Sequence, residues 1–293
     1  NDGDTRAIGQ VAAAYVQEHL ELGEHVQAIA GLRFDRFSLD FENRRTGDLL
    51  SRTDRMVSPR AGLVVKPMRA LSVYGTYSVS ALPSSGDQFA TLSVSTKALE
   101  PEHFINQEVG VKWEPVRSII LQAAAYQLER SNTTAPDPVD PSLVVQTGRQ
   151  RTTGLEVDAT GSITSRWQLA GGFASQSAKI VSRTKAAAEG ATVPLVPRTT
   201  FSLWNRVQVK GPFALGAGVV HQTRMYAAVD NKVTLPGFTR YDAAAFLALG
   251  HGLTAQVNVE NLLDTHYFAT SHGNDNIMPG ARRGVRISLS ARP

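Results

Sequence analysis

Residues 253–264 read LTAQVNVENLLD and residues 284–291 read GVRISLSA, and in both stretches apolar and polar side chains alternate. In the second stretch, for example, Val285, Ile287 and Leu289 occupy every other position. Such alternation predicts strands with one apolar and one polar face. In a soluble sheet the polar face meets water, whereas in an outer-membrane barrel the apolar face meets lipid and the polar face lines the lumen. These two stretches alone leave both architectures open.

The same alternation continues back through the chain and predicts thirteen strands and no convincing helix. The predicted strands are residues 6–20, 26–41, 57–66, 71–80, 106–114, 118–130, 143–162, 167–181, 198–209, 213–227, 238–249, 253–268 and 284–292. Most exceed the roughly five or six residues of an ordinary strand. They are long enough for tilted strands that cross a bilayer, which take about 9–11 residues.

The predicted connections alternate between short and long. The short ones are residues 21–25, 67–70, 115–117, 163–166, 210–212 and 250–252. The long ones are residues 42–56, 81–105, 131–142, 182–197, 228–237 and 269–283. A soluble Greek-key fold has no reason to place every long loop at one end, whereas an outer-membrane barrel has short periplasmic turns and long extracellular loops. The pattern therefore predicts an all-β fold, an antiparallel transmembrane β-barrel.

Composition agrees with a single β domain over residues 1–293. The net charge is +4 and the basic residues are scattered, so we expect no nucleic-acid partner. There is no cysteine, which excludes disulfides, thiolate chemistry and cysteine–zinc sites. The chain opens without Met and without a basic and apolar leader, which is typical of a mature or excised piece.

Catalytic and metal-binding patterns are missing from the sequence. It contains no Gly-x-Ser-x-Gly, phosphate loop or dinucleotide fingerprint. His266 and His272 lack a zinc-binding spacing. We therefore expect no catalytic residue, no metal ligand and no cofactor, and we do not expect the protein to be an enzyme.

Several motifs resemble those of a known family. The C-terminal set comprises NLLD at residues 261–264, Tyr267, PGAR at residues 279–282 and VRISLS at residues 285–290. It resembles the C-terminal end of TonB-dependent siderophore receptors. Further similar stretches are residues 58–64, 72–78, 99–102, 108–113 and 153–157. Residues 82–89 most resemble the subgroup that takes up ferric catecholates. In order and spacing the matches cover nearly the whole chain.

This resemblance implies a barrel of about 22 strands, plugged by an N-terminal domain that follows a TonB-contacting segment. The chain is then expected to hold about thirteen of those strands, the C-terminal part of the barrel, without the plug. An odd number of strands cannot close an all-antiparallel barrel, so we expect an open curved sheet or an abnormal closure. Family members usually end in an aromatic residue, whereas this chain ends in Pro293.

The resemblance also implies a function in the outer membrane of a Gram-negative bacterium. It implies a receptor that contacts outer-membrane lipid, binds a ferric siderophore and couples uptake to TonB. A passive porin-like channel is the alternative. Binding a bulky anionic chelate calls for cationic and aromatic side chains near the extracellular mouth.

Ten residues in or beside the long loops are candidates for contact with such a chelate. They are Arg44, Arg45, Arg52, Arg55, Gln88, Phe89, Arg183, Lys185, Arg224 and Tyr226. The competing interpretation is that these side chains are merely solvated or paired with lumen carboxylates such as Glu156. Residues 42–56 illustrate it, because their acidic residues reduce the net charge of that segment to +1.

Overall fold

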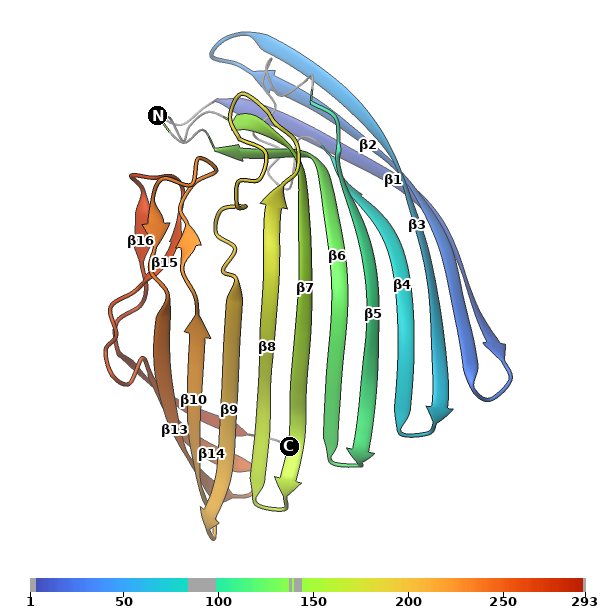
Figure 1. Cartoon of the computed structure of the whole chain (residues 1–293). Coiled ribbons are helices and arrows are strands. Elements are labelled where there is room, and N and C mark those ends of the chain that lie inside the picture. Colours follow the sequence, from blue (N-terminus) through green and yellow to red (C-terminus); the bar gives the residue numbers. More distant parts are fainter. Residues whose placement is uncertain (1–3, 84–98, 137–138, 140–143, 292–293) are drawn as a thin grey trace.

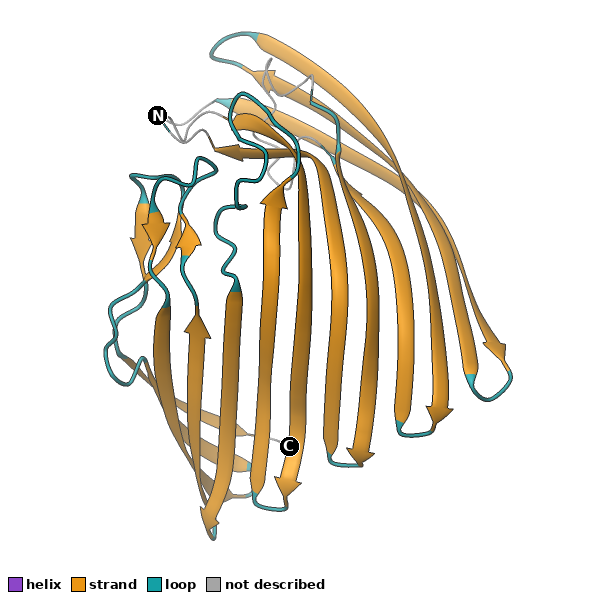
Figure 2. Ribbon diagram, in the orientation of Figure 1, coloured by secondary structure: helices purple, strands orange, loops and turns teal. Residues whose placement is uncertain are grey.

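The structure is a computed structural model that describes residues 4–83, 99–136, 139 and 144–291. Within these residues the chain consists of strands joined by turns and loops (Figures 1 and 2). No described helix has the length and apolar character needed to cross a membrane. The predicted all-β fold is confirmed.

Thirteen strands form one antiparallel sheet in the order β1 to β10, then β13, β14 and β17. The main strands are β1 (Thr5–Leu22), β2 (Val26–Asn43), β3 (Asp48–Met68), β4 (Leu71–Leu82), β5 (Glu102–Val116), β6 (Ile119–Pro136), β7 (Val144–Thr164), β8 (Trp167–Ile180), β9 (Thr199–Lys210), β10 (Phe213–Gln222), β13 (Phe238–Gly250), β14 (Leu253–Glu260) and β17 (Gly284–Ala291). Two small hairpins pair β11 (Met225–Tyr226) with β12 (Thr234–Leu235), and β15 (Phe268–Ser271) with β16 (Ile277–Pro279).

The sheet is open. Strands β1 and β17 form its two edges, and within the described residues they pair with β2 and β14 and not with each other. Figure 1 shows a curved wall that does not close on itself. The predicted count of thirteen strands and the predicted open curved sheet are both confirmed.

Short turns lie at one end of the wall and most long connections at the other (Figure 1). The prediction of a long loop over residues 42–56 is wrong. Strands β2 and β3 stay paired up to Asn43 and Asp48, so only residues 44–47 form the turn. The paired part buries an apolar cluster that includes Phe37, Leu39 and Met56, and this burial explains why the ladder continues.

Three other predicted boundaries also move. Strand β6 runs to Pro136 and strand β7 begins at Val144, so residues 131–136, which were predicted as loop, belong to β6. The predicted strand over residues 213–227 ends at Gln222, and the predicted strand over residues 253–268 ends at Glu260. In the last two cases polar side-chain contacts, described below, replace the ladder.

Cross-strand pairing places apolar residues on one face of the sheet. Directly paired residues of antiparallel strands share a face. Val111 pairs with Val73 and Ala123, and Leu155 pairs with Ala125. This face lacks cover, since Val73 is 40% exposed and Leu155 is 58% exposed. A continuous exposed apolar band that crosses the sheet is unusual for a soluble monomer and suits contact with lipid.

The opposite face is polar and carries aromatic rings laid over glycines. Tyr74 pairs with Gly110, and its hydroxyl donates a hydrogen bond of 2.7 Å to Glu108 Oε1. A Cβ atom on Gly110 would lie 2.5 Å from the Tyr74 ring. Tyr126 lies over Gly154 in the same way. Only glycine leaves room for these rings, which lock neighbouring strands together on the lumen side.

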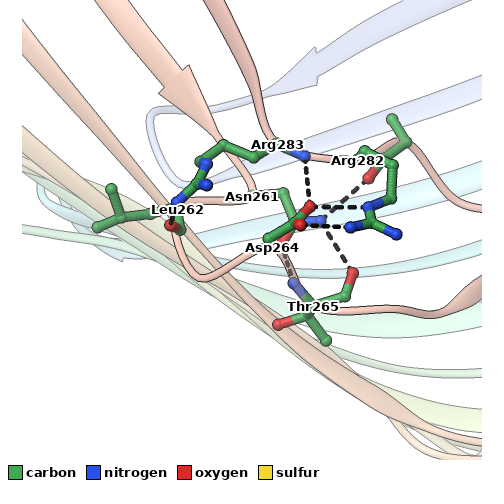
Figure 3. A network of polar contacts seen from close by, with 7 residues as sticks. Asn261, Leu262, Asp264, Thr265, Arg282 and Arg283 are labelled. Atoms are coloured by element: carbon green, nitrogen blue, oxygen red, sulfur yellow. Dashed lines mark hydrogen bonds and ion pairs between the residues drawn. The ribbon is translucent and has the colours of Figure 1, made fainter.

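Residues 261–264 follow β14 and form a tight turn (Figure 3). Asn261 is 1% exposed and has a positive φ of 54°, a conformation that asparagine tolerates better than most residues. Its side-chain amide donates to the carbonyls of Thr265 (2.9 Å) and Ala281 (3.0 Å). Its Oδ1 accepts the N–H of Thr265 at 2.8 Å. One side chain therefore satisfies backbone groups on both sides of the loop.

Asp264 completes this network. Its carboxylate accepts two hydrogen bonds from the Arg282 guanidinium and one from the Arg283 backbone N–H at 2.9 Å (Figure 3). The Arg282 hydrogen bonds, followed by the Arg283 N–H, hold the pKa of Asp264 well below its usual range. The NLLD and PGAR motifs thus contact each other, and the contact leads the chain from β14 into β17.

The Tyr74–Gly110 pair predicts a stability difference between two glycines. Gly110→Ala places a methyl group 2.5 Å from Tyr74 ring atoms, so the ring must shift and we expect a loss of about 1–3 kcal/mol. Gly75→Ala, on the adjacent strand, is the matched control because the nearest atom would lie 3.9 Å from its Cβ. Urea unfolding of the refolded protein in detergent micelles measures both. Equal unfolding midpoints for the two variants would contradict the packing described here.

Asp264 predicts a pH dependence. Because the pKa of its carboxyl is lower in the folded chain than in the unfolded chain, its stabilising effect is fully present at neutral pH. That effect is lost as the pH falls below about 4 and through the lowered pKa. Wild type should therefore unfold later than Asp264→Asn at pH 7, and the difference should shrink in acid. Asp275→Asn, at an exposed carboxylate with no ion pair in the described chain, is the control. A difference that does not change with pH would refute this role.

Candidate ligand site at the long-loop end of the sheet

Four of the predicted ligand residues lie on the β2–β3 hairpin, and the structure does not gather them. Arg44 lies 3.6 Å from carboxylate oxygens of Asp4 and Glu42. Arg45 is exposed in the turn, and Arg55 is exposed on β3. The small hollow at this tip, about 280 Å³, is lined by Arg6 but also by Asp40 and Glu42. Its charge is unsuited to an anionic ligand.

Arg52 is the clearest departure from the prediction. Its side chain is only 13% exposed and forms an ion pair of 2.8 Å with Asp54, which is itself 4% exposed. The ladder of β2 and β3 carries it into the paired part of the hairpin. Arg52 was expected to face solvent from a loop, but it is partly buried and paired with a carboxylate of its own strand. This agrees with the competing interpretation, in which the cations pair with carboxylates of the protein.

The remaining predicted residues fall into three groups. Gln88 and Phe89 lie outside the described residues. Arg183 and Lys185 are exposed in the segment that follows β8. Arg224 and Tyr226 line a hollow of about 910 Å³, a volume within the range of small-molecule sites. Only this last pair is brought together around a cavity.

The hollow lies where β8 and β9 separate. Their pairing ends at Ser175 and Thr199, although one more backbone hydrogen bond joins Gln176 N–H to Arg198 O at 2.8 Å. Its lining comes from the last part of β8, from residues 192–198 and from residues 221–237. It includes Lys179, Arg198 and Arg224, and none of the described residues that line it is Asp or Glu. The lining is therefore cationic.

Arg198 was not among the predicted ligand residues. The ladder of β9 and β10 pairs Thr200 with Gln222, and Thr223 N–H donates to Thr199 O at 3.0 Å. Arg198 and Arg224 come directly after this last bond, one on each segment, and both line the hollow. Both side chains are exposed, and neither has an acidic partner within the described chain. One signal was present in the sequence, because Arg198 is a cation at the boundary between the predicted loop over residues 182–197 and the strand that follows it.

The wall behind the hollow is built from three connections packed together. Ile180 and Ala178 of β8 form an apolar cluster with Val193 and with Val229 of the next connection. Asn231 accepts the N–H of Thr192 at 2.7 Å and donates to its carbonyl at 2.8 Å. These contacts hold residues 187–193 against residues 229–231.

The third connection joins through two side chains. Ser271 Oγ donates to Ala227 O at 2.8 Å, and Asn274 donates to both carboxylate oxygens of Asp230 at 3.1 and 3.0 Å. Met225, Leu235 and Ile277 pack together beneath these bonds. The hollow is therefore preformed and framed by connections fixed to one another.

Comparison with known proteins identifies the family that shares this architecture. The profile of the family described as TonB dependent receptor-like, beta-barrel, matches residues 1–262. The probable TonB-dependent receptor BfrD of Bordetella pertussis is 29% identical over 99% of this chain and 42% of that protein. The probable TonB-dependent siderophore receptor PiuA of Acinetobacter baumannii is 26% identical over 98% of this chain and 41% of that receptor. The chain thus spans less than half the length of these relatives.

Solved structures agree on the fold. The crystal structure of PiuA superposes with a TM-score of 0.85 at 24% identity, over 98% of this chain and 43% of that one. The closed form of the ferric-catecholate import receptor Fiu from Escherichia coli K12 gives 0.82 at 23% identity, over 97% of this chain and 45% of that one. A long open antiparallel sheet with one apolar face is what a wall segment of such a receptor requires. The chain belongs to the TonB-dependent receptor family and forms part of its outer-membrane β-barrel.

Proposed function

We propose that this chain, as a single barrel segment over residues 1–293, serves a receptor that takes up ferric siderophores across the outer membrane. The chelate would bind at the long-loop end of the wall and pass inward with energy supplied through TonB. The contact with TonB would be made by parts of the receptor other than this sheet. The proposal includes no covalent chemistry and no resident cofactor, and iron travels as part of the ligand.

The observation that carries this proposal is the cationic hollow beside Arg198, Arg224 and Tyr226. It lies at the end of the wall that carries the long loops, and it has the size and charge for a bulky anionic chelate. Two relatives support the choice of ligand class, because PiuA is named a siderophore receptor and Fiu a catecholate siderophore receptor.

The other predicted ligand contacts remain part of the proposal, and we order them by their position relative to the hollow. Arg224 and Tyr226 face the hollow directly. Arg183 and Lys185 lie on the same connection as its lining and are placed to meet an arriving chelate. Arg44, Arg45 and Arg55 are exposed on the β2–β3 hairpin, which β4 to β7 separate from β8 in the sheet, and would act through long-range attraction. Arg52 is paired with Asp54 and is the weakest candidate.

A passive porin-like channel is the second candidate. General pores need a wide lumen and no preformed ligand site, whereas here three connections frame a cationic hollow. The family membership also favours energy-coupled uptake over passive flow.

Iron uptake by cells tests the proposal. The complete receptor is expressed in a bacterium that lacks its own siderophore receptors, and uptake of radioactive iron as a tris-catecholate is followed. We expect uptake that requires both the receptor and TonB. Residues 1–293 expressed alone should give none, because both sheet edges would be unpaired in lipid. Equal uptake in cells without TonB would support the porin alternative, and uptake by residues 1–293 alone would contradict the proposal.

A further inference from the structure

We propose that Arg198 and Arg224 are the charge-selecting contacts of this receptor, and that they favour net-anionic iron(III) chelates over neutral ones of similar size. The inference rests on the proposed function and narrows its substrate class.

The first argument is the position of two arginines. The β9–β10 ladder ends with the bond between Thr199 and Thr223, and Arg198 and Arg224 are the next residue of each segment and line the same hollow. Like charges around one hollow repel, and each exposed guanidinium lacks a carboxylate partner within the described residues. An anion bound between the two cations would offset this repulsion.

The second argument is the chemistry of the lining. Lys179 supplies a third cation, which donates to Thr192 Oγ1 at 2.9 Å, and the described lining holds no carboxylate. A guanidinium is planar and presents paired N–H donors that match two adjacent anionic oxygens. Chelating catecholates and carboxylates offer such oxygen pairs around the iron. A neutral hydroxamate chelate offers shape but no charge to offset the repulsion.

The third argument is that the hollow is built before the ligand arrives. Asn231 fixes Thr192, and the cluster of Ile180, Val193 and Val229 fixes the segment behind it. Tyr226 adds an aromatic wall to the same hollow. The cost of ordering these groups is therefore not taken from the binding free energy. Charge complementarity is left as the main discriminator between chelates of equal size.

Binding titrations on the purified complete receptor in detergent test this inference. Quenching of tryptophan fluorescence reports binding of two probes, iron(III) tris-catecholate and the neutral iron(III) tris-acetohydroxamate. Arg198→Gln and Arg224→Gln should each weaken tris-catecholate binding about tenfold, the effect expected for a lost hydrogen bond to a charged group. Arg198→Lys keeps the charge and should recover part of the loss. Wild-type affinity for tris-catecholate should fall as salt is added.

A matched control separates the effect of Arg198 and Arg224 from that of general surface charge. Arg36→Gln removes an exposed arginine on β2, toward the same end of the wall and outside the hollow, and should leave binding unchanged. Folding of each variant is checked by the shift in gel mobility on heating, since the substituted side chains are exposed. Unchanged tris-catecholate binding in both glutamine variants would overturn the inference. So would equal wild-type affinity for the two probes, although the proposed function would survive either result. A wild-type receptor that binds no iron chelate would overturn the proposed function as well.

Discussion

In a bilayer no water is present to bond exposed backbone groups, so each membrane-spanning strand must be hydrogen-bonded to a neighbour on both sides. The other features of this wall follow from that requirement. Eleven of the thirteen sheet strands have two partners, while β1 and β17 each have one among the described residues. Once the ladder is continuous, alternation sends every second side chain to lipid, and the apolar band follows. The wall described here therefore needs further strands before it can close.

Beyond the apolar band, water can take part in bonding, and side chains replace the ladder. Asn231 and Asn261 have the same structural role at two different loops. Each takes a positive φ, and each bonds backbone groups through both ends of its amide. Asn231 bonds Thr192, whereas Asn261 bonds the nearby Thr265 and the more distant Ala281. The first holds the wall of the hollow, and the second, with Asp264, leads the chain into β17. The loop end is thus shaped by a few polar side chains and small apolar clusters, while the barrel is shaped by repetition.

This division explains which features the sequence could predict. Alternation is a local property, so it predicted thirteen strands, their faces and the open edges. It failed over residues 42–56, where acidic and basic residues between Phe41 and Met56 concealed a paired hairpin. It also missed Arg198, because the hollow that this residue lines is assembled from segments far apart in the sequence. The contacts of Asn231 join residues far apart in the sequence, and no local pattern reports them.

The central claim is that one face of this sheet meets lipid and the other meets the lumen. Residues 1–293 contain no cysteine, so single cysteines can be introduced along β7, at positions 155 to 158 in turn, in a complete receptor whose other segments are also free of cysteine. Each variant is spin-labelled in lipid nanodiscs. Collisions of the label with oxygen report lipid, and collisions with a water-soluble nickel complex report the lumen. The account predicts strict alternation, with labels replacing Leu155 and Val157 in lipid and labels replacing Glu156 and Asp158 in water. Labels at all four positions sharing one environment, or the opposite alternation, would contradict it.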